Sequence, residues 1–196
     1  MKSPIYWHPV IYHLLMRALY GEYFRTRYKA IAELIPDHAS VTEVCAGDCY
    51  LFRNYLKKKN VKYLGLDINS SFVRYGQRNN IPILQHDLFT DEVPPADYVI
   101  IHASLYQFMP NHEFVVRKLL AAAKSVLLIA EPIRNLSSSQ NPLISFIAKY
   151  SANPGKDHTV HRLNKETLIT FFQKFIEFKR VKEVDGEREI IGVFNK

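Results

Sequence analysis

The segment VTEVCAGDCYL, residues 41–51, passes from β-branched residues through a tight turn into a helical pattern. Gly47 is the residue of this turn that allows a sharp change of backbone direction, or the close approach of a ligand. A strand, a turn and a helix in this order begin a βαβ unit, and the loops that follow parallel strands line one edge of the sheet. The segment therefore predicts an open parallel sheet with a binding loop after its first strand.

Beyond this segment, short apolar runs alternate with helical patterns, which is typical of successive βαβ units. The predicted strands lie at 40–45, 62–67, 81–85, 96–103 and 124–131, and the predicted helices at 51–59, 70–79, 111–123 and 164–175. Ser70 and Asn111 are the expected N-caps of the second and third of these helices. The last two strands, 177–184 and 188–196, flank an Asp-Gly pair, which favours a hairpin. The pattern predicts an α/β fold whose mostly parallel, seven-stranded sheet ends in an antiparallel C-terminal hairpin.

Composition narrows the class of protein. The chain has 196 residues, of which 47% are hydrophobic, and this suits one core in a single domain. We expect a cytoplasmic protein, because no apolar stretch reaches the ~20 residues of a membrane span and no signal-peptide cleavage site follows the N-terminus. Cys45 and Cys49 are expected to be reduced, half-buried thiols, and without a second pair of ligands they do not predict a zinc site.

The net charge of +7 is scattered along the chain, and only Lys57–Asn60 forms a basic run. Such a run is usually the solvated end of a helix. The same charge would also attract a phosphorylated metabolite, a nucleic acid or the surface of an anionic membrane, to which the protein could bind peripherally.

Three strand ends carry candidate ligand-binding residues. Gly47 follows the first strand, Asp67 ends the second about 20 residues later, and Asp87 follows the third. Asp67 is placed to accept hydrogen bonds from ribose hydroxyls, and Asp87 to accept one from an adenine amino group. Aspartates also cap helices and occupy turns, so each acid alone is a weak signal. Their succession at three neighbouring strand ends favours a nucleoside-containing cofactor.

With these residues the sequence resembles the class I, Rossmann-like S-adenosylmethionine-dependent methyltransferases over residues 41–196. The first motif of that family is an acid followed by three glycines at alternate positions. Glu43 matches the acid and Gly47 the middle glycine, while Cys45 and Cys49 stand at the other two glycine positions. The runs IIHASLYQF and LLIAEPI, residues 100–108 and 127–133, are similar to the motifs on the fourth and fifth strands.

The resemblance implies a three-layer Rossmann-like sandwich that binds S-adenosyl-L-methionine. It assigns the ribose to Asp67 and the adenine amino group to Asp87, with Ile68 and Leu88 on either side of the adenine ring. The residues that it implies for cofactor binding are Glu43, Cys45, Ala46, Gly47, Asp67, Ile68, Asp87, Leu88 and His102. The expected parts of the domain are an N-terminal helical cap, a cofactor-binding core, a lid or insertion, and a C-terminal helix with the hairpin, at residues 1–36, 40–133, 134–162 and 163–196.

A nicotinamide dehydrogenase would also place an acid after a glycine loop. A dinucleotide binds its pyrophosphate at the N-terminus of the first helix, where the helix dipole favours an anion. Asp48 puts a carboxylate at that position, and two of the required glycines are absent. Glu43 and Asp48 instead predict a mildly negative loop, which suits the ammonium and sulfonium groups of S-adenosylmethionine.

Methyl transfer requires the acceptor atom, the methyl group and the sulfur to be aligned, and a base only where the acceptor must lose a proton. The candidate catalytic residues are His158 and Tyr106. The candidate residues for binding the acceptor are Tyr6, Trp7, Tyr12, Arg27, Glu131 and His161. The histidines at 158 and 161 could equally be surface residues, and an aromatic stripe in the N-terminal region is commonly core packing. The sequence has no acid cluster at the fourth strand for a metal.

The leading hypothesis is methyl transfer to a small, partly apolar or anionic molecule. The Asn-Pro-Pro-Tyr-like motif that acts on flipped bases is absent after the fourth strand, so a nucleic acid is disfavoured as the acceptor. An RNA-modifying methyltransferase is the second hypothesis, and a non-catalytic module that binds the cofactor is the third. The acceptor, the methylated atom and the oligomeric state do not follow from the sequence.

Overall fold

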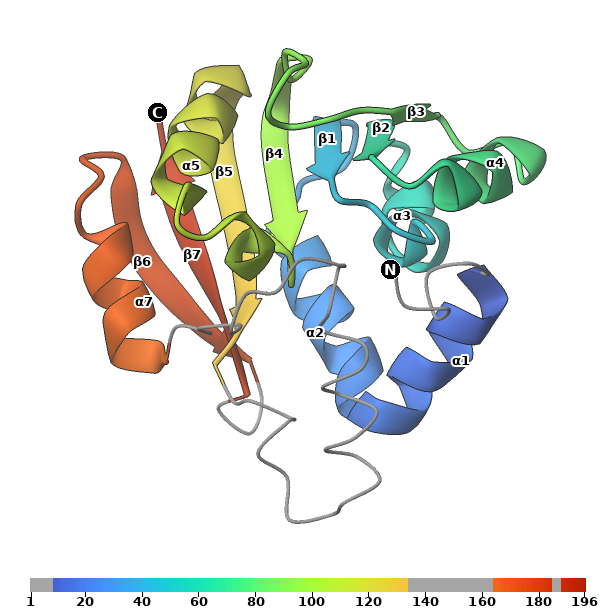
Figure 1. The fold of residues 1–196 in the computed structure, drawn as a ribbon, viewed down its shortest axis with the longest axis horizontal. Helices are drawn as coiled ribbons and strands as arrows, with labels where there is room; N and C mark the ends of the chain where they lie inside the picture. The colour runs from blue at the N-terminus through green and yellow to red at the C-terminus, as the bar shows by residue number, and fades with distance from the viewer. Residues whose placement is uncertain (1–8, 134–163, 185–187) are drawn as a thin grey trace.

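The computed structural model describes residues 9–133, 164–184 and 188–196, and they fold around one mixed sheet (Figure 1). The predicted lid and the turn of the C-terminal hairpin lie outside the described residues. The strands are β1 (Ser40–Val44), β2 (Lys62–Asp67), β3 (Ile83–Gln85), β4 (Ala96–His102), β5 (Ala123–Pro132), β6 (Phe178–Val184) and β7 (Glu189–Asn195). Their order across the sheet is β3-β2-β1-β4-β5-β7-β6.

The strand pairing confirms the predicted fold. Strands β1 to β5 pair in parallel, whereas β7 pairs antiparallel with both β5 and β6. Strands β1 and β4 are neighbours although β2 and β3 lie between them in the sequence, so the strand order reverses beside β1. In an open α/β sheet the crevice at such a reversal is the usual place for a ligand.

The helices follow the predicted pattern with local differences. They are α1 (Pro9–Tyr20), α2 (Tyr23–Ala32), α3 (Tyr50–Asn54), α4 (Ser70–Arg78), α5 (His112–Ala122) and α7 (Lys165–Phe172), with short 3-10 helices η2 (Leu56–Lys59) and η3 (Leu105–Phe108). The predicted helix over 51–59 is wrong as one element, because Tyr55 leaves helical geometry with φ −129° and ψ −53° and separates α3 from η2.

Two N-cap predictions also need correction. Asn69, not Ser70, caps α4, because its side chain accepts a hydrogen bond from the Ser71 N–H, whereas Ser70 is already helical. Asn111 does precede α5, but its side chain makes no capping hydrogen bond. Asn164 caps α7 by accepting from the Thr167 N–H over 2.8 Å.

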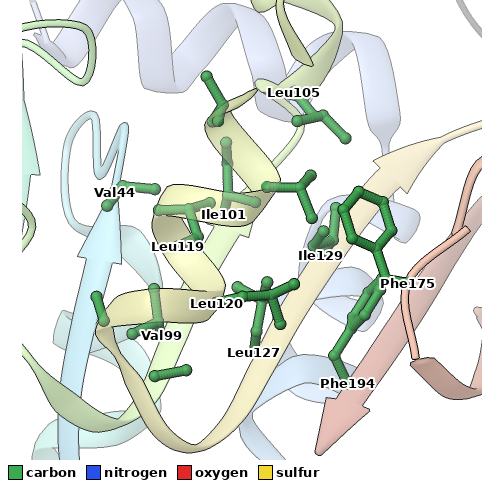
Figure 2. Packing of buried hydrophobic residues seen from close by; sticks show 14 of the residues in the cluster. Val44, Val99, Ile101, Leu105, Leu119, Leu120, Leu127, Ile129, Phe175 and Phe194 are labelled. Atoms are coloured by element: carbon green, nitrogen blue, oxygen red, sulfur yellow. The ribbon is translucent and has the colours of Figure 1, made fainter. Parts of the chain in front are cut away.

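Apolar side chains form a core on each face of the sheet, so the molecule has three layers. On one face, Leu119 of α5 is fully buried among Ile101 and Ile129 (Figure 2). Phe172 of α7 is fully buried in the same cluster. On the other, Ile31 of α2 and Leu51 of α3 are fully buried. Burial of large aliphatic and aromatic side chains is worth about 1.5–3 kcal/mol each, so these two clusters hold the sheet between its helices.

The carboxyl ends of β1, β2 and β4 lie at the same edge of the sheet, and α1 and α2 approach this edge (Figure 1). Within residues 9–133, 164–184 and 188–196, no helix is long and apolar enough to cross a membrane. The loops that leave this edge contain most of the residues that the sequence nominates for binding.

Candidate cofactor and acceptor site

The loop from β1 to α3 has three left-handed residues at alternate positions. Cys45, Gly47 and Cys49 have φ angles of 54°, 55° and 55°. Ala46 N–H donates to the Leu66 carbonyl over 3.0 Å, so the loop is held against the end of β2. The backbone thus adopts the shape that three glycines would give most cheaply, although two of the three residues are cysteines.

The two cysteines face different surroundings. Cys49 is fully buried in the core on the α2 side, while Cys45 is half-buried and packs against the opposite core. The expectation of two half-buried thiols is therefore wrong for Cys49. Both are free thiols, and burial raises the pKa of each, so neither is a reactive thiolate at neutral pH.

Asp67 joins this loop to the end of β2. Its Oδ2 accepts a hydrogen bond from the Gly47 N–H over 2.8 Å, and its Oδ1 accepts one from the Asn69 N–H over 2.8 Å. A carboxylate has about four lone-pair positions, so both oxygens can accept further donors. An ideal Cβ placed on Gly47 would meet no atom of the described residues within 4 Å, so this part of the chain leaves space beside the loop.

The residues after β2 and β3 form the next part of the site. Ile68 is 56% exposed, but Leu88 is buried in the core, so only one of the two predicted adenine walls faces solvent. Phe89, one residue later, is 48% exposed, and its ring packs edge-on against Phe108 at 5.6 Å. Asp87 is half-buried, and its Oδ1 accepts from the Phe89 N–H over 2.9 Å. The sequence pattern did not predict that Phe89 is exposed beside Asp87.

The acids near the loop are less negative than the sequence suggests. Glu43 is buried in β1 and accepts a hydrogen bond from the Tyr63 hydroxyl over 2.6 Å. Burial raises its pKa from 4.5 to about 8, more than the bond from Tyr63 lowers it. Glu43 is therefore protonated at neutral pH and faces the interior of the protein, where it contributes little negative potential.

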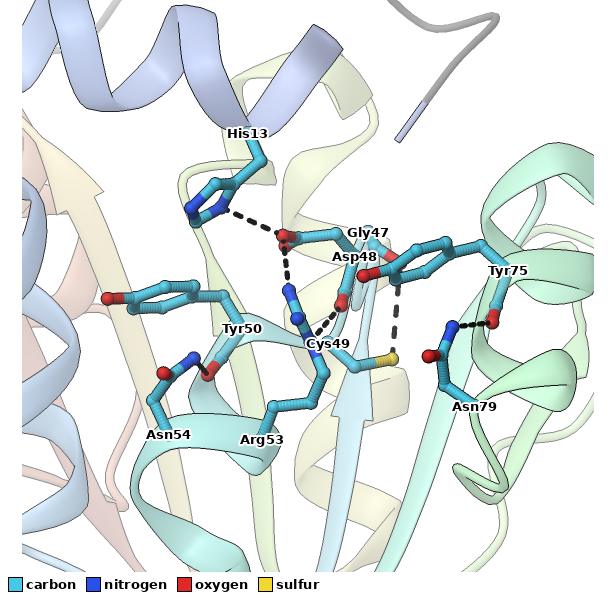
Figure 3. A network of polar contacts seen from close by, with 9 residues as sticks. All are labelled: His13, Gly47, Asp48, Cys49, Tyr50, Arg53, Asn54, Tyr75 and Asn79. Carbon is cyan, nitrogen blue, oxygen red and sulfur yellow. Dashed lines mark hydrogen bonds and ion pairs between the residues drawn. The ribbon is translucent and has the colours of Figure 1, made fainter. Parts of the chain in front are cut away.

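Asp48 is buried as well, and its carboxylate contacts the side chains of Arg53 and His13 (Figure 3). Its Oδ2 lies 2.8 Å from Arg53 Nη2 and 3.1 Å from His13 Nδ1, and Arg53 Nε donates to the Asp48 carbonyl over 3.0 Å. Burial raises the pKa of Asp48, against the effect of Arg53 and His13. The prediction of a mildly negative loop is thus wrong, and His13 instead ties α1 to the loop.

A second polar cluster lies where β4 and β7 meet α2. Arg27 Nε donates to His102 Nε2 over 2.8 Å and lies 3.0 Å from Glu189 Oε2. All three side chains are buried, and the ring of Tyr28 packs edge-on against His102 at 4.7 Å. Arg27 is therefore not a loose side chain above the site. It fastens α2 to the carboxyl end of β4, where His102 was expected to line the cofactor.

Glu131 and Tyr106 lie on the other face of the sheet. Glu131 Oε1 accepts from the backbone N–H groups of Ser104 and Leu105 over 2.7 and 2.6 Å, which caps η3. A small, mostly apolar pocket opens beside this contact. It is lined by Leu105, Tyr106, Met109, His112, Glu131, Pro132 and Leu168. Two of the nominated residues thus share one pocket, and His112 adds a polar group that the sequence analysis did not single out.

The remaining nominated residues belong to the N-terminal segment and the predicted lid. Tyr6, Trp7, His158 and His161 lie outside the described residues, and Tyr12 is placed only as part of the α1 backbone. In the described part of the chain, no group of three His, Cys, Asp or Glu side chains could hold a metal ion.

Sequence reasoning also missed Glu189, whose only signal is a charge at the start of the otherwise apolar run EIIGVF.

Comparison with known proteins finds similarity in the fold but not in the sequence. No protein-family model matches the sequence, and no curated protein matches it. Solved structures do match. A magnesium protoporphyrin IX methyltransferase from Synechocystis PCC 6803 with bound SAH is 12% identical, with 94% of each chain covered and a TM-score of 0.66. The chain has the class I methyltransferase fold.

Two further structures show the same likeness. A SAM-dependent methyltransferase from Archaeoglobus fulgidus is 16% identical, over 94% of this chain and 99% of that one, with a TM-score of 0.64. An O-methyltransferase family 2 protein from Planctomyces limnophilus, solved with apigenin, is 16% identical over 94% of this chain and 61% of that one, with a TM-score of 0.64. At these identities the likeness establishes the fold alone.

Proposed function

We propose that the protein transfers the methyl group of S-adenosylmethionine to a small acceptor molecule. The observation that carries the proposal is the contact between Asp67 and the Gly47 N–H, which joins the carboxyl ends of β1 and β2 at the reversal of strand order. Beside it lie the open space at Gly47 and the exposed side chain of Ile68. This arrangement suits an adenosyl group, with its ribose at Asp67 and its adenine against Ile68.

The residues described fit the remaining parts of the cofactor. Asp87 and the exposed ring of Phe89 lie after β3, where the amino group and one face of adenine would be received. When bound, the cofactor supplies an electrophilic methyl group on a sulfonium. The role of the chain is to align an acceptor with that group and to exclude water, since a positioned pair of reactants gains most of its rate from orientation.

The pocket beside η3 is the proposed acceptor site. Its lining is mostly apolar, with Tyr106, His112 and Glu131 as polar groups at its wall. A mostly apolar lining with a few polar groups suits a partly apolar molecule that is oriented through a few polar contacts. Tyr106 is proposed to orient the acceptor. The predicted base His158 stays a prediction, because it lies outside the described residues.

A labelled-methyl transfer assay against separate metabolite, lipid and RNA extracts tests this proposal. We expect label in a small-molecule fraction with the wild type, and its loss with Asp67→Ala. Asp37→Ala is the matched control, since Asp37 is an exposed aspartate whose only ion pair among the described residues is with Lys59 at 3.9 Å. Label in RNA alone would favour the RNA-modifying alternative. Cofactor binding without any labelled product would favour the non-catalytic module.

A further inference from the structure

Arg27, His102 and Glu189 form a buried polar cluster with more polar contacts than side chains that only line a pocket would require. The three side chains come from α2, β4 and β7, and they are 5%, 8% and 3% exposed. Both Nε and Nη2 of Arg27 lie within hydrogen-bond distance of the same imidazole nitrogen, His102 Nε2. The carboxylate of Glu189 lies 3.3 Å from that nitrogen.

The protons of this cluster follow from the chemistry of its members. A guanidinium keeps all its protons and only donates, so the nitrogen that faces Arg27 must accept. His102 Nε2 therefore carries a lone pair and no proton. A neutral imidazole whose Nε2 is an acceptor has its proton on Nδ1. Glu189 balances the charge of Arg27. Without Arg27, the Glu189 carboxylate, which only accepts hydrogen bonds, would favour a proton on Nε2.

His102 Nδ1 is available to a ligand. It forms no hydrogen bond with any residue that the structure describes. Nor is it one of the two buried side-chain atoms in that part of the chain that lack a partner, which are His86 Nδ1 and Glu189 Oε1. The side chain of His102 as a whole is 6% exposed, so a ligand that reached Nδ1 would meet it in a nearly water-free setting.

The surroundings of the ring favour its neutral form. Among the residues that the structure describes, the charged and titratable groups that face it are Arg27 and Tyr28 from α2 and Glu189 from β7. Burial lowers the pKa of His102, and the Arg27 guanidinium lowers it further, against the opposite effect of Glu189. A positive charge on the ring would meet a guanidinium at hydrogen-bond distance, which a buried site tolerates poorly.

We propose that Arg27 and Glu189 are positioning residues that hold His102 as a neutral imidazole protonated on Nδ1, so that His102 donates a hydrogen bond to an oxygen of the bound cofactor and does not act as a base. The identity of the ligand in this statement rests on the proposed function. The protonation of His102 does not, because it is set by contacts within the chain.

Nuclear magnetic resonance of the full chain with isotope-labelled histidine tests the protonation directly, without any ligand. The His102→Gln variant assigns the signal. We expect His102 to be neutral with its proton on Nδ1 at neutral pH, and to gain a second proton only at the low end of, or below, the range of about pH 5 to pH 8 in which histidines usually titrate. A proton on Nε2, or an imidazolium at neutral pH, would overturn the proposal. Once the His102 signal is assigned, the wild-type spectrum decides the protonation.

Variants then test which residue sets the proton. Arg27→Met leaves Nε2 beside Glu189, so His102 should become cationic within the same pH range. Lys29→Met removes an exposed cation from the same helix and should change nothing. Glu189→Gln keeps Arg27 and should keep the proton on Nδ1, which provides a second test if Arg27→Met does not fold. A proton that moves to Nε2 in Glu189→Gln would contradict the assignment.

The role as a donor is tested by adding S-adenosylhomocysteine to the labelled wild type. Once calorimetry shows that the compound binds, we expect the signal of the Nδ1 proton to shift. Binding without any shift would remove the donor role and leave the protonation intact. Absence of binding would instead count against the proposed function and, with it, against the cofactor as the partner of His102.

Discussion

Cys45 and Cys49 adopt the same left-handed backbone but differ in burial. Comparing the stabilities of their glycine variants therefore distinguishes the effect of backbone strain from that of side-chain packing. Glycine at either position relieves about 1–2 kcal/mol of left-handed strain and adds a similar loss of chain entropy in both variants. Cys49→Gly also removes a fully buried side chain. We expect it to be less stable than Cys45→Gly by about 1 kcal/mol, the order of one buried methylene and its cavity.

Denaturant unfolding of the two variants measures this difference. The backbone effects are common to both, so the order of stability reports burial alone. Equal stabilities, or a more stable Cys49→Gly, would show that the thiol of Cys49 does not contribute to the core on the α2 side.

Glu43 predicts a pH dependence of stability whose sign is unusual for a carboxyl group. Its pKa is raised from 4.5 to about 8 in the folded state, so the folded chain binds one more proton than the unfolded chain between these values. Stability from this group is therefore present below about pH 4.5 and is lost as the pH rises toward 8, by about 1.4 kcal/mol per pH unit at most. Glu43→Gln should gain stability relative to the wild type between pH 5 and pH 8.

Unfolding by denaturant at about pH 5 and pH 8, across the range in which stability usually peaks, tests this. Glutamine still accepts the Tyr63 hydroxyl through its amide oxygen, so the comparison isolates the proton. An exposed acid is the control, and Glu166→Gln should leave the pH dependence as in the wild type. If the free energy of unfolding of Glu43→Gln changed with pH in the same way as that of the wild type, the carboxyl group would be charged in the folded protein.

At the scale of elements, the contact between α7 and β7 depends on the missing side chain of Gly192. An ideal Cβ there would lie 2.6 Å from Phe172 Cε2, and Phe172 is fully buried and cannot move away freely. We expect Gly192→Ala to destabilise the protein by about 1–3 kcal/mol through overpacking. Unfolding measurements on Gly192→Ala and on its combination with Phe172→Leu check this, because the smaller side chain should recover part of the loss. Wild-type stability of the single variant would contradict it.

Local features of the helices and strands could be predicted from the sequence, whereas contacts between distant residues could not. Strand β2 lies at Lys62–Asp67 as predicted, because its apolar run and its terminal acid are local signals. The break between α3 and η2 and the cap at Asn69 depend on backbone angles that several residues could adopt. The pattern placed Asp67 at the right strand end, but the contact of Arg27 with Glu189 joins residues from opposite ends of the chain, and no local periodicity records it.

For the whole molecule, the carboxyl edge of the sheet is organised by buried pairs and not by an overall charge. Glu43 is protonated, Asp48 is held by Arg53 and His13, and Glu189 by Arg27. The net charge of +7 therefore gives little guidance on what binds at this edge. Asp67 is the acid at the reversal of strand order whose two oxygens accept hydrogen bonds from the backbone N–H groups of Gly47 and Asn69. Recognition of a cofactor by this fold should depend on it.

Calorimetric titration of the purified protein with S-adenosylmethionine tests that claim most directly. We predict binding to the wild type, binding to Asp67→Ala that is about tenfold to a hundredfold weaker, as expected for lost hydrogen bonds to a charged group, and unchanged binding to Asp37→Ala. Heat with a nicotinamide dinucleotide and none with S-adenosylmethionine would contradict the account, as would full affinity in Asp67→Ala.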